Sequence, residues 1–445
     1  MGEDRKDRRG YRSWDFLKGL GEDHLEGALG FMSRCKTERE AVRHLASALA
    51  QAGFGQDGQV TQRGTFVNLK GRAIGAYRPG RRPAREGVRI VASHGDSPRI
   101  DIKPKPLYED KGLLMGDCHY YGGIKQYQWV NVPLELRGEV HLKDGTAVEL
   151  DGSQFRLVIP DLAPHLDRNM DARKASETIK GEDLDVILGH RPGDSDVKGA
   201  VLGLLKDRYG FGEEDLVSAD LALVPQGDAF LGGVDGSLLI SYGLDDRICT
   251  YTSFEAFMGA RDLEQGAVFL CLDREEIGSE GVGGAQGALI RLLLSYVLEA
   301  EGASGPFDLE RALAASEAIS ADVTEAYNPM YKDAFDHNQL PVAGDGPAMM
   351  KFTGVKGKYD ASESRGEFVA RVRARLDGAS VPWQVGSLGK VGTGGGGTVA
   401  KYLARYGMDV LDLGPAVISL HAPYEIMSAA DVTATVAAYR AFYER

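Results

Sequence analysis

The sequence has few cysteines and no long apolar run. Its four cysteines lie far apart and form no Cys-x-x-Cys pair, which excludes a zinc knuckle and argues against a secreted disulfide framework. No window approaches about 18 uncharged apolar residues, and the N-terminal stretch MGEDRKDRRGYRSWDF lacks the apolar core of a signal peptide. We therefore expect a soluble protein of the reducing cytoplasm.

Basic residues are outnumbered by acidic ones. The 445 residues include 52 Lys and Arg and 65 Asp and Glu, which gives a formal net charge of −13. That charge disfavours nucleic acid or an anionic membrane as the main partner. The 43% apolar and 26% charged residues are typical of a folded chain large enough for more than one core. Peptides, small molecules and metal cations remain as expected partners.

The chain alternates in character along its length. Apolar residues at helical spacing predict two opening helices in 13–52, with a polar break at 36–40. Tyrosine-rich and glycine-rich hairpin signals surround short alternating strands in 104–233, which indicates an inserted β-rich domain. Strand-like and helical runs alternate on both sides of it. The sequence thus predicts an α/β domain in two parts, 1–103 and 234–445.

Histidines and carboxylates end or follow five strand-like runs. Ligand-type residues at the carboxyl ends of strands occupy the usual site position in open α/β sheets. Two histidines and three carboxylates suit a pair of zinc-class ions that share a bridging aspartate. The five positions are His94, Asp245, Glu276, Asp322 and His421.

Two adjacent carboxylates, Glu275 and Glu276, follow the apolar run 267–272. Neighbouring like charges repel unless protons, cations or solvent separate them. The pair is therefore either a solvated loop or a divided site. In the divided site, one carboxylate binds metal and the other stays unligated as a general base, because a metal-bound water needs a proton acceptor beside it. The pair alone leaves both interpretations open.

Three further local patterns have both functional and structural explanations. In His94-Gly-Asp96 the two side chains fall on one side of the strand end, so Asp96 can orient the imidazole. A single His-x-Asp motif is, however, usually structural. Asp246 can cap the helix that follows while Asp245 points to the site. The glycine cluster at 392–397 lacks the order of a phosphate-binding loop, so we expect a tight backbone wall there.

Taken in order, these residues resemble the aspartyl aminopeptidase family of dinuclear zinc metallo-aminopeptidases. The site motifs are His94-x-Asp96, Leu-Asp245, Asp-x-Glu275-Glu276-x-Gly-Ser, Ser-Ala-Asp322 and His421-x-Pro-x-Glu425. Further stretches that look like the family's signatures are Tyr121-Gly-Gly123, Pro164-His-Leu-Asp-Arg168, Leu231-Gly-Gly233 and Gly346-Pro347. The series covers nearly the whole chain, which makes the resemblance specific.

The resemblance implies a set of metal ligands. His94 and Asp322 would hold one ion, and Glu276 and His421 would hold the other. Asp245 would bridge the two. Zinc is the metal that the family implies, while cobalt and manganese also suit a carboxylate-rich site.

The same resemblance implies the catalytic residues. Glu275 would be the general base that takes a proton from water and returns it to the leaving amine. Asp96 would orient His94, and one metal would meet the free amino group of the substrate. The substrates would be peptides that lose their N-terminal residue.

The family's fold and assembly follow as further expectations. The resemblance implies a zinc-exopeptidase-like catalytic domain, a mixed sheet flanked by helices, with an inserted β-rich dimerisation domain at 104–233. It also implies a homo-oligomer in which dimers assemble into a tetrahedral dodecamer that encloses the active sites.

The chain departs from the family pattern at positions associated with substrate. Glu325 stands where the family usually has a histidine, and Tyr127 stands where it has another in the inserted domain. Lys351 matches the family's substrate-facing lysine. We expect these three residues to bind substrate, and a carboxylate at position 325 argues against a strict preference for acidic N-terminal residues.

Two other functions are compatible with the pattern. One is a dinuclear hydrolase of the same fold that acts on another bond, such as a deacetylase or a cellulase-like relative. The other is an inactive scaffold that keeps the assembly without catalysis. The presence of every expected ligand and of Glu275 favours the aminopeptidase.

Overall fold

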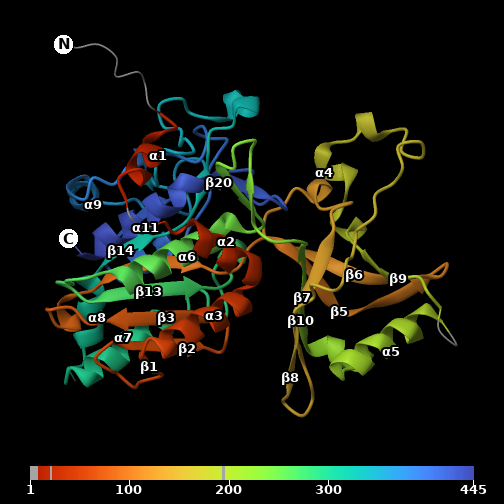
Figure 1. Cartoon of the computed structure of the whole chain (residues 1–445), viewed down its shortest axis with the longest axis horizontal. Coiled ribbons are helices and arrows are strands. Elements are labelled where there is room, and N and C mark those ends of the chain that lie inside the picture. The colour runs from red at the N-terminus through yellow and green to blue at the C-terminus, as the bar shows by residue number, and fades with distance from the viewer. Residues whose placement is uncertain (1–8, 21–22, 193–195, 304, 445) are drawn as a thin grey trace. The chain divides into compact units, whose positions relative to one another are not determined.

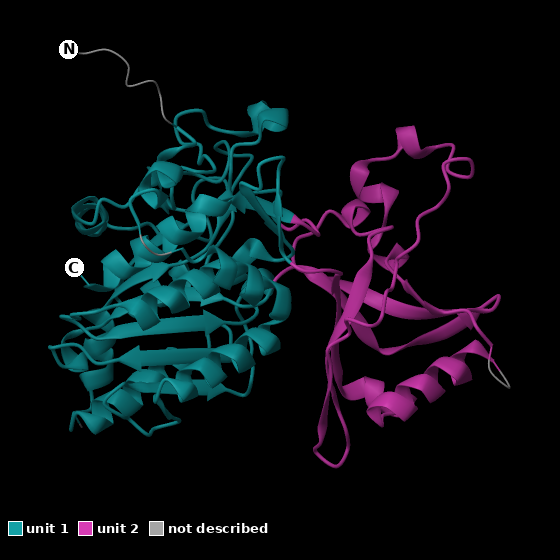
Figure 2. Cartoon of the chain, viewed as in Figure 1, with its two compact units in different colours: residues 1–96, 229–420, 425–445 teal, residues 97–228, 421–424 magenta. Residues whose placement is uncertain are grey.

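The computed structural model describes residues 9–20, 23–192, 196–303 and 305–444. Residues 1–8 lie outside this description. They are the first half of the polar N-terminal stretch in which we expect no signal peptide. The chain divides into two compact units (Figure 2). Unit 1 comprises 1–96, 229–420 and 425–445, and unit 2 comprises 97–228 and 421–424.

A mixed nine-stranded sheet runs through unit 1 (Figure 1). Across the sheet its strands are β1 (Gly55–Gln56), β2 (Thr65–Leu69), β3 (Ala73–Arg78), β13 (Ala267–Leu272), β4 (Arg89–His94), β14 (Glu317–Ser320), β18 (Asp409–Gly414), β16 (Ala348–Met350) and β17 (Gln384–Val385). Strands β13, β4, β14 and β18 pair parallel to one another. Antiparallel strands β3 and β16 adjoin this parallel core.

The central strands of unit 1 are apolar on both faces. In β4, Val91 packs into one hydrophobic cluster, while Ile90 and Ala92 pack into another. The residues of β13 alternate between the same two clusters, and every residue of both strands is buried. Such runs are typical of parallel strands covered by helices on both sides.

Helices supply that cover (Figure 1). One hydrophobic cluster takes side chains from α2 (Leu25–Arg34), α3 (Glu38–Gln51), α6 (Leu244–Gly259), α9 (Gly366–Gly378) and α11 (Ala429–Glu444). The other takes them from α7 (Leu289–Ala300), α8 (Asp308–Ala314) and α10 (Ala400–Ala404). No helix in the described ranges is long and apolar enough to cross a lipid bilayer.

The N-terminal region differs from the prediction of two helices. It contains α1 (Arg12–Leu17) in addition to α2 and α3. The polar break at 36–40 marks the start of α3, where Thr37 and Glu40 form a capping box. The prediction treated α1 and α2 as one helix, because a short connection between two helices hardly changes the spacing of the apolar residues.

A smaller five-stranded sheet completes unit 1. Across it lie β11 (Phe230–Gly232), β12 (Leu238–Ser241), β20 (Glu425–Ser428), β19 (Ala416–Ile418) and β15 (Thr324–Glu325). Strands β12 and β20 are antiparallel, with Ser241 opposite Glu425. Strands β15 and β19 are parallel. Several of the predicted site residues follow or adjoin these short strands.

Unit 2 contains a six-stranded sheet, in the order β8 (Ala147–Leu150), β7 (Leu134–His141), β10 (Ala219–Pro225), β5 (Arg99–Asp110), β6 (Leu113–Tyr121) and β9 (Val186–Gly189). Its helices α4 (Ala175–Thr178) and α5 (Val197–Tyr209) were not predicted. The expected boundary at residue 104 falls inside β5. Two prolines there, which lack an N–H, coincide with a register shift between Ile102 and Leu107.

The glycine cluster at 392–397 makes close backbone contacts, as the sequence suggested. A Cβ on Gly394 would lie 2.1 Å from the carbonyl oxygen of Leu388. A Cβ on Gly395 would lie 2.0 Å from that of Gly354. Only residues without a side chain allow these approaches.

A buried carboxylate attaches α1 to the rest of unit 1. Asp431 on α11 accepts hydrogen bonds from the Ser13 hydroxyl at 2.6 Å and from the backbone N–H groups of Gly344 at 2.7 Å and Gly346 at 3.0 Å. Burial raises the pKa of Asp431 to about 6, although these hydrogen bonds act in the opposite direction. The carboxylate thus joins three segments that are distant in sequence.

We expect the Asp431→Asn variant to show a different dependence of stability on pH. The pKa of Asp431 is raised in the folded state, so its contribution to stability falls as the pH rises from about 4 to about 6. The free energy of unfolding of the wild type, minus that of the variant, should therefore fall over this range, by at most about 3 kcal/mol. Urea unfolding at several pH values measures it.

The exposed Asp262→Asn change is the matched control, because the Asp262 side chain is 91% accessible. Its difference from the wild type should stay constant with pH. A constant difference for Asp431→Asn as well would contradict the effect of burial.

Candidate metal centre

Three neighbouring strands of the nine-stranded sheet end at the same edge, and each leads to a predicted site residue. Strand β4 ends at His94, β13 precedes Glu275, and β14 precedes Asp322. The parallel register places Leu272, the last residue of β13, beside His94. The carboxyl ends of parallel strands therefore bring these residues to one edge.

His94 lies at the centre of this edge, with 1% of its surface exposed. Its Nδ1 lies 3.0 Å from the carbonyl oxygen of Asp96. Because a carbonyl oxygen only accepts, Nδ1 carries the hydrogen. Its Nε2 faces three carboxylates, at 3.4 Å from Asp245 Oδ1 and 3.9 Å from both Asp322 Oδ1 and Glu275 Oε2.

Asp96 connects the imidazole to the paired glutamates. Its Oδ1 lies 3.4 Å from Nδ1 of His94. The same carboxylate accepts the backbone N–H of Glu275 and that of Glu276, each at 3.2 Å. Asp96 is fully buried. One side chain thus fixes both the ring and the turn.

The paired glutamates lie in a short 3₁₀ turn, Glu275–Ile277. Arg274 and Ser279, on either side, have positive φ values of 62° and 59°. The backbone N–H of Ser279 donates to the carbonyl oxygen of Arg274 at 2.7 Å, which closes the turn. The side chain of Asp273 accepts the N–H of Arg274 at 2.8 Å. The turn is therefore held by hydrogen bonds at its base.

Asp245 and Asp246 have non-helical backbone angles inside α6 and are joined by a cis peptide bond. The N–H of Asp245 donates to Oε2 of Glu425 at 3.0 Å. Oδ2 of Asp246 accepts the N–H of His94 at 3.1 Å. The prediction that Asp246 caps α6 is wrong, because its carboxylate holds the end of β4 instead.

The charges at this edge are unbalanced. Burial alone would lower the pKa of His94, but hydrogen bonds to Asp245 and Asp96 outweigh it and raise that pKa well above its usual value. Burial raises the pKa of Asp322 well above its ordinary range, and the charges of Asp246 and Asp245 add to the effect. Burial also raises the pKa of Asp246. Crowded buried carboxylates of this kind favour a bound cation.

The ligand atoms lie close enough together to hold a metal ion. His94, Asp245 and Asp322 offer ligand atoms within 4.8 Å of one another, and so do His94, Glu275 and Glu276. Imidazole nitrogen and carboxylate oxygen are zinc ligands. The residues present therefore fit a divalent ion, and the first group contains three of the residues predicted from the sequence.

His421 belongs to unit 2. Its Nδ1 lies 2.7 Å from the carbonyl oxygen of Gly123, to which it donates. In the neutral ring Nε2 is then the nitrogen without hydrogen, as metal ligation requires. A Cβ on Gly123 would lie 3.6 Å from Nδ1. The Tyr121-Gly-Gly123 motif thus includes the residue that orients the His421 ring.

The three residues expected to bind substrate lie in different surroundings. Glu325 accepts two backbone N–H groups from the segment just before His421. Nζ of Lys351 lies 3.9 Å from Oε1 of Glu363, and both side chains are about half exposed. Tyr127 belongs to unit 2 and is 45% exposed. Their role in substrate binding stays a prediction.

Some of the residues that shape the centre were assigned no role there from the sequence. Glu425, which is 1% exposed, holds Asp245 by its backbone. Gly414 lies so near Asp322 that an added Cβ would be 1.9 Å from the Asp322 carbonyl oxygen. Glu425 stood in the His421-x-Pro-x-Glu425 motif, which was a usable signal, whereas no local pattern marks Gly414.

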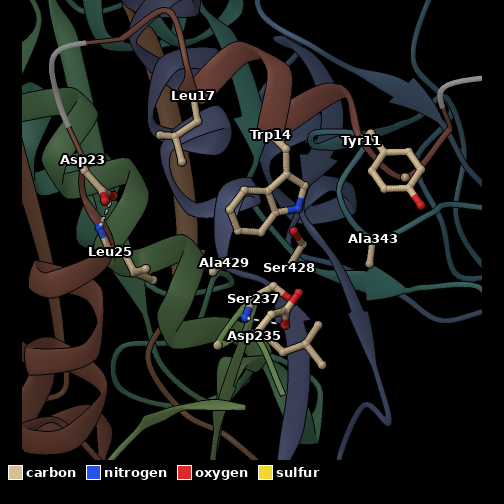
Figure 3. A pocket seen from close by; sticks show the side chains of 13 residues that line it. Tyr11, Trp14, Leu17, Asp23, Leu25, Asp235, Ser237, Ala343, Ser428 and Ala429 are labelled. Carbon is tan, nitrogen blue, oxygen red and sulfur yellow. Dashed lines mark hydrogen bonds between the residues drawn. The ribbon is translucent and has the colours of Figure 1, made fainter. Parts of the chain in front are cut away.

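Unit 1 also has a hollow of about 610 Å³ (Figure 3). Trp14, Tyr11, Asp235 and Ser428 are among its lining residues. Leu238, at the start of β12, is opposite Ser428 at the end of β20, so the hollow adjoins the strand ends remote from Asp245 and Glu425. None of the predicted site residues lines it.

Comparison with known proteins gives the family. The sequence profile described as Aminopeptidase I zinc metalloprotease (M18) matches residues 31–443. The chain belongs to the M18 family. It is 40% identical over 458 residues to a probable M18 family aminopeptidase 1 of Thermotoga maritima, with 100% of each chain covered. This protein is a metal-dependent aminopeptidase, and the resemblance seen in the sequence is confirmed.

Solved M18 structures have the same fold. The crystal structure of an M18 aminopeptidase from Thermotoga maritima has a TM-score of 0.89 at 39% identity and covers 100% of this chain and 99% of its own. The predicted α/β class is confirmed. A more distant structure, the S. cerevisiae mApe1 dodecamer, has a TM-score of 0.77 at 21% identity, with 95% and 97% covered. It shares the fold.

We expect Gly414→Ala to disturb the M18 metal centre. Because the added Cβ would overlap the backbone of Asp322, β18 and the Asp322 segment have to separate. If Asp322 is a ligand, as the sequence predicts, displacing it in this way should lower metal affinity and kcat/KM by roughly tenfold or more. Metal analysis after dialysis and kinetics with a peptide substrate measure both.

Gly366→Ala serves as the matched control for this change. No atom lies within 4 Å of a Cβ built there, so metal content and activity should remain at the wild-type level. Wild-type metal affinity in Gly414→Ala would show that the Asp322 segment tolerates the displacement.

Proposed function

We propose that this M18 aminopeptidase removes the N-terminal residue of peptides with two divalent ions and a glutamate base. One observation carries the proposal: a buried imidazole whose Nε2 faces Asp245, Asp322 and Glu275 within 3.9 Å. A structural histidine needs one partner, not three carboxylates in a buried site. The arrangement therefore suits cation binding with a carboxylate beside it.

The ligands proposed for the two ions follow the sequence prediction. His94 and Asp322 would hold the first ion and Asp245 would be shared, which agrees with the group of three ligand atoms in unit 1. Glu276 and His421 would hold the second. The hydrogen bond from Nδ1 of His421 to a backbone carbonyl supports this role, because it leaves Nε2 in the ligating form.

The division of labour between the adjacent glutamates follows from their positions. When bound, divalent ions would lower the pKa of a water and polarise the scissile carbonyl. Glu275 accepts the proton of the attacking water and returns it to the leaving nitrogen. Asp96 holds both glutamate N–H groups, so the base and the ligand keep a fixed separation. His94 stays neutral as a ligand, with its hydrogen on Nδ1.

The proposed ions also favour a free amino terminus. An unprotonated amine nitrogen can ligate a divalent ion, whereas an acetylated nitrogen cannot. We propose that zinc is the resident metal, and that cobalt or manganese can replace it.

We also propose that the protein works as a homo-oligomer in the cytoplasm. A dodecamer is the state named for S. cerevisiae mApe1, which shares this fold. Unit 2 exposes large apolar side chains, such as Leu166 at 74% and Leu204 at 70%, which suits dimerisation through this unit. The cysteines at 35, 118, 249 and 271 are free and buried, which is compatible with a reducing compartment.

Hydrolysis of dipeptides with free and blocked amino groups tests the reaction. We expect turnover of the free-amine forms and a fall of at least about a hundredfold when the amine is acetylated, because the site would lose its interaction with the amine. The panel should vary the N-terminal side chain among acidic, basic and apolar residues. Equal turnover of blocked and free forms would point to a hydrolase of another bond.

We expect Glu275→Gln to lose activity while it keeps its metal. An amide cannot accept the proton of water at neutral pH, so kcat should fall by roughly a hundredfold or more. The variant should still bind about two ions per chain, and removal of the metal with a chelator should abolish the wild-type activity. Stopped-flow kinetics and metal analysis measure the two effects separately.

Glu280→Gln is the matched control, because Glu280 lies nearby but is exposed. It should keep wild-type kcat and metal content. A fully active, metal-replete Glu275→Gln protein would exclude Glu275 as the base.

A further inference from the structure

The segment that leads into His421 has an uncommon backbone conformation. Ser419 and His421 have φ values of 64° and 63°, in a region that residues other than glycine seldom adopt. Such a conformation persists only where surrounding contacts hold it. The contacts of this segment therefore hold the residues that immediately precede His421.

Glu325 makes two of these contacts. Its Oε1 accepts the backbone N–H of Ser419 at 3.2 Å, and its Oε2 accepts that of Leu420 at 3.1 Å. Hydrogen bonds to an ionised carboxylate are roughly twice as strong as bonds between neutral groups. Both oxygens of Glu325 thus contact the two residues just before His421.

Glu325 is also joined to the segment of another proposed ligand. It follows Asp322 closely in the chain and lies in β15, opposite Val417 of β19. The backbone N–H of Ala326 donates to the carbonyl oxygen of Val417 at 2.7 Å. The backbone of β15 and the side chain of Glu325 therefore hold together the segments that lead from Asp322 and into His421.

We propose that Glu325 is a positioning residue for the metal centre and that it does not select the substrate side chain. It holds the backbone of Ser419 and Leu420, the two residues that precede His421. The inference rests on the proposed function, because it takes His421 as a ligand of the second ion. It also replaces the substrate-binding role that the position of Glu325 in the sequence suggested.

Variants of Glu325 separate the two roles. Glu325→Ala removes both acceptors. Glu325→Gln keeps one acceptor oxygen and turns an NH₂ group toward the other backbone N–H. Ser419→Gly is the matched control, because it keeps the backbone N–H that Glu325 accepts and tolerates a positive φ.

The affinity for each metal ion is the main readout. Competition with a chromophoric chelator gives the zinc affinities, and the visible absorption of the cobalt-loaded protein reports the ligand geometry. We expect Glu325→Ala to lower the affinity for one of the two ions ten- to a hundredfold. Glu325→Gln should lower this affinity less, and Ser419→Gly should change it by less than about twofold. The ratios of kcat/KM among substrates with basic, apolar and acidic N-terminal residues should stay unchanged.

The opposite pattern would overturn the inference. The Glu325→Ala variant could bind both ions with wild-type affinity and change the order of preference among the substrates. That result would identify Glu325 as a substrate contact. A wild type that binds fewer than two ions would refute the proposed function, and the inference with it. If circular dichroism shows that Glu325→Ala is unfolded, Glu325→Gln decides by the same two measurements.

Discussion

The crowding of carboxylates around one buried imidazole sets the demands on the rest of unit 1. Asp245, Asp322 and Glu275 all lie within 3.9 Å of Nε2 of His94. Burial of several like charges is unfavourable unless a cation compensates them. Without a cation the carboxylates would move apart or take up protons, as the raised pKa of Asp322 indicates. The scaffold therefore has to hold this arrangement before a cation binds.

The scaffold meets that demand with carboxylates that accept backbone N–H groups. Apart from the segment of Asp322, the segments that bear a proposed ligand or the proposed base are held by a carboxylate from a distant part of the chain. A bond to the backbone fixes where a segment runs, while the side chain of the ligand keeps its own rotamer. The pairs are Asp96 with Glu275 and Glu276, Asp246 with His94, Glu425 with Asp245, and Glu325 with Ser419 and Leu420.

The sequence predicted the site's composition better than the contacts that support it. Runs such as 267–272 showed buried strands, and the residues that followed them were ligand types, so the edge of the sheet could be anticipated. The role of Asp246 was predicted wrongly, because an aspartate before a helix looks like a cap whether or not a distant N–H competes for it. The contacts of Glu325 join residues far apart in the chain, and no periodicity records them. Helix α5 was missed because strand signals surround it.

The position of β4 in the sheet has a consequence for synthesis of the chain. This strand is made early, yet its two neighbours, β13 and β14, come from beyond the whole of 97–228. Strand β4 therefore waits with both edges unpaired while unit 2 emerges, and pairing across such a sequence separation is slow. The centre around His94 forms only after Asp322 has left the ribosome. A nascent chain thus lacks the assembled centre during most of its own translation.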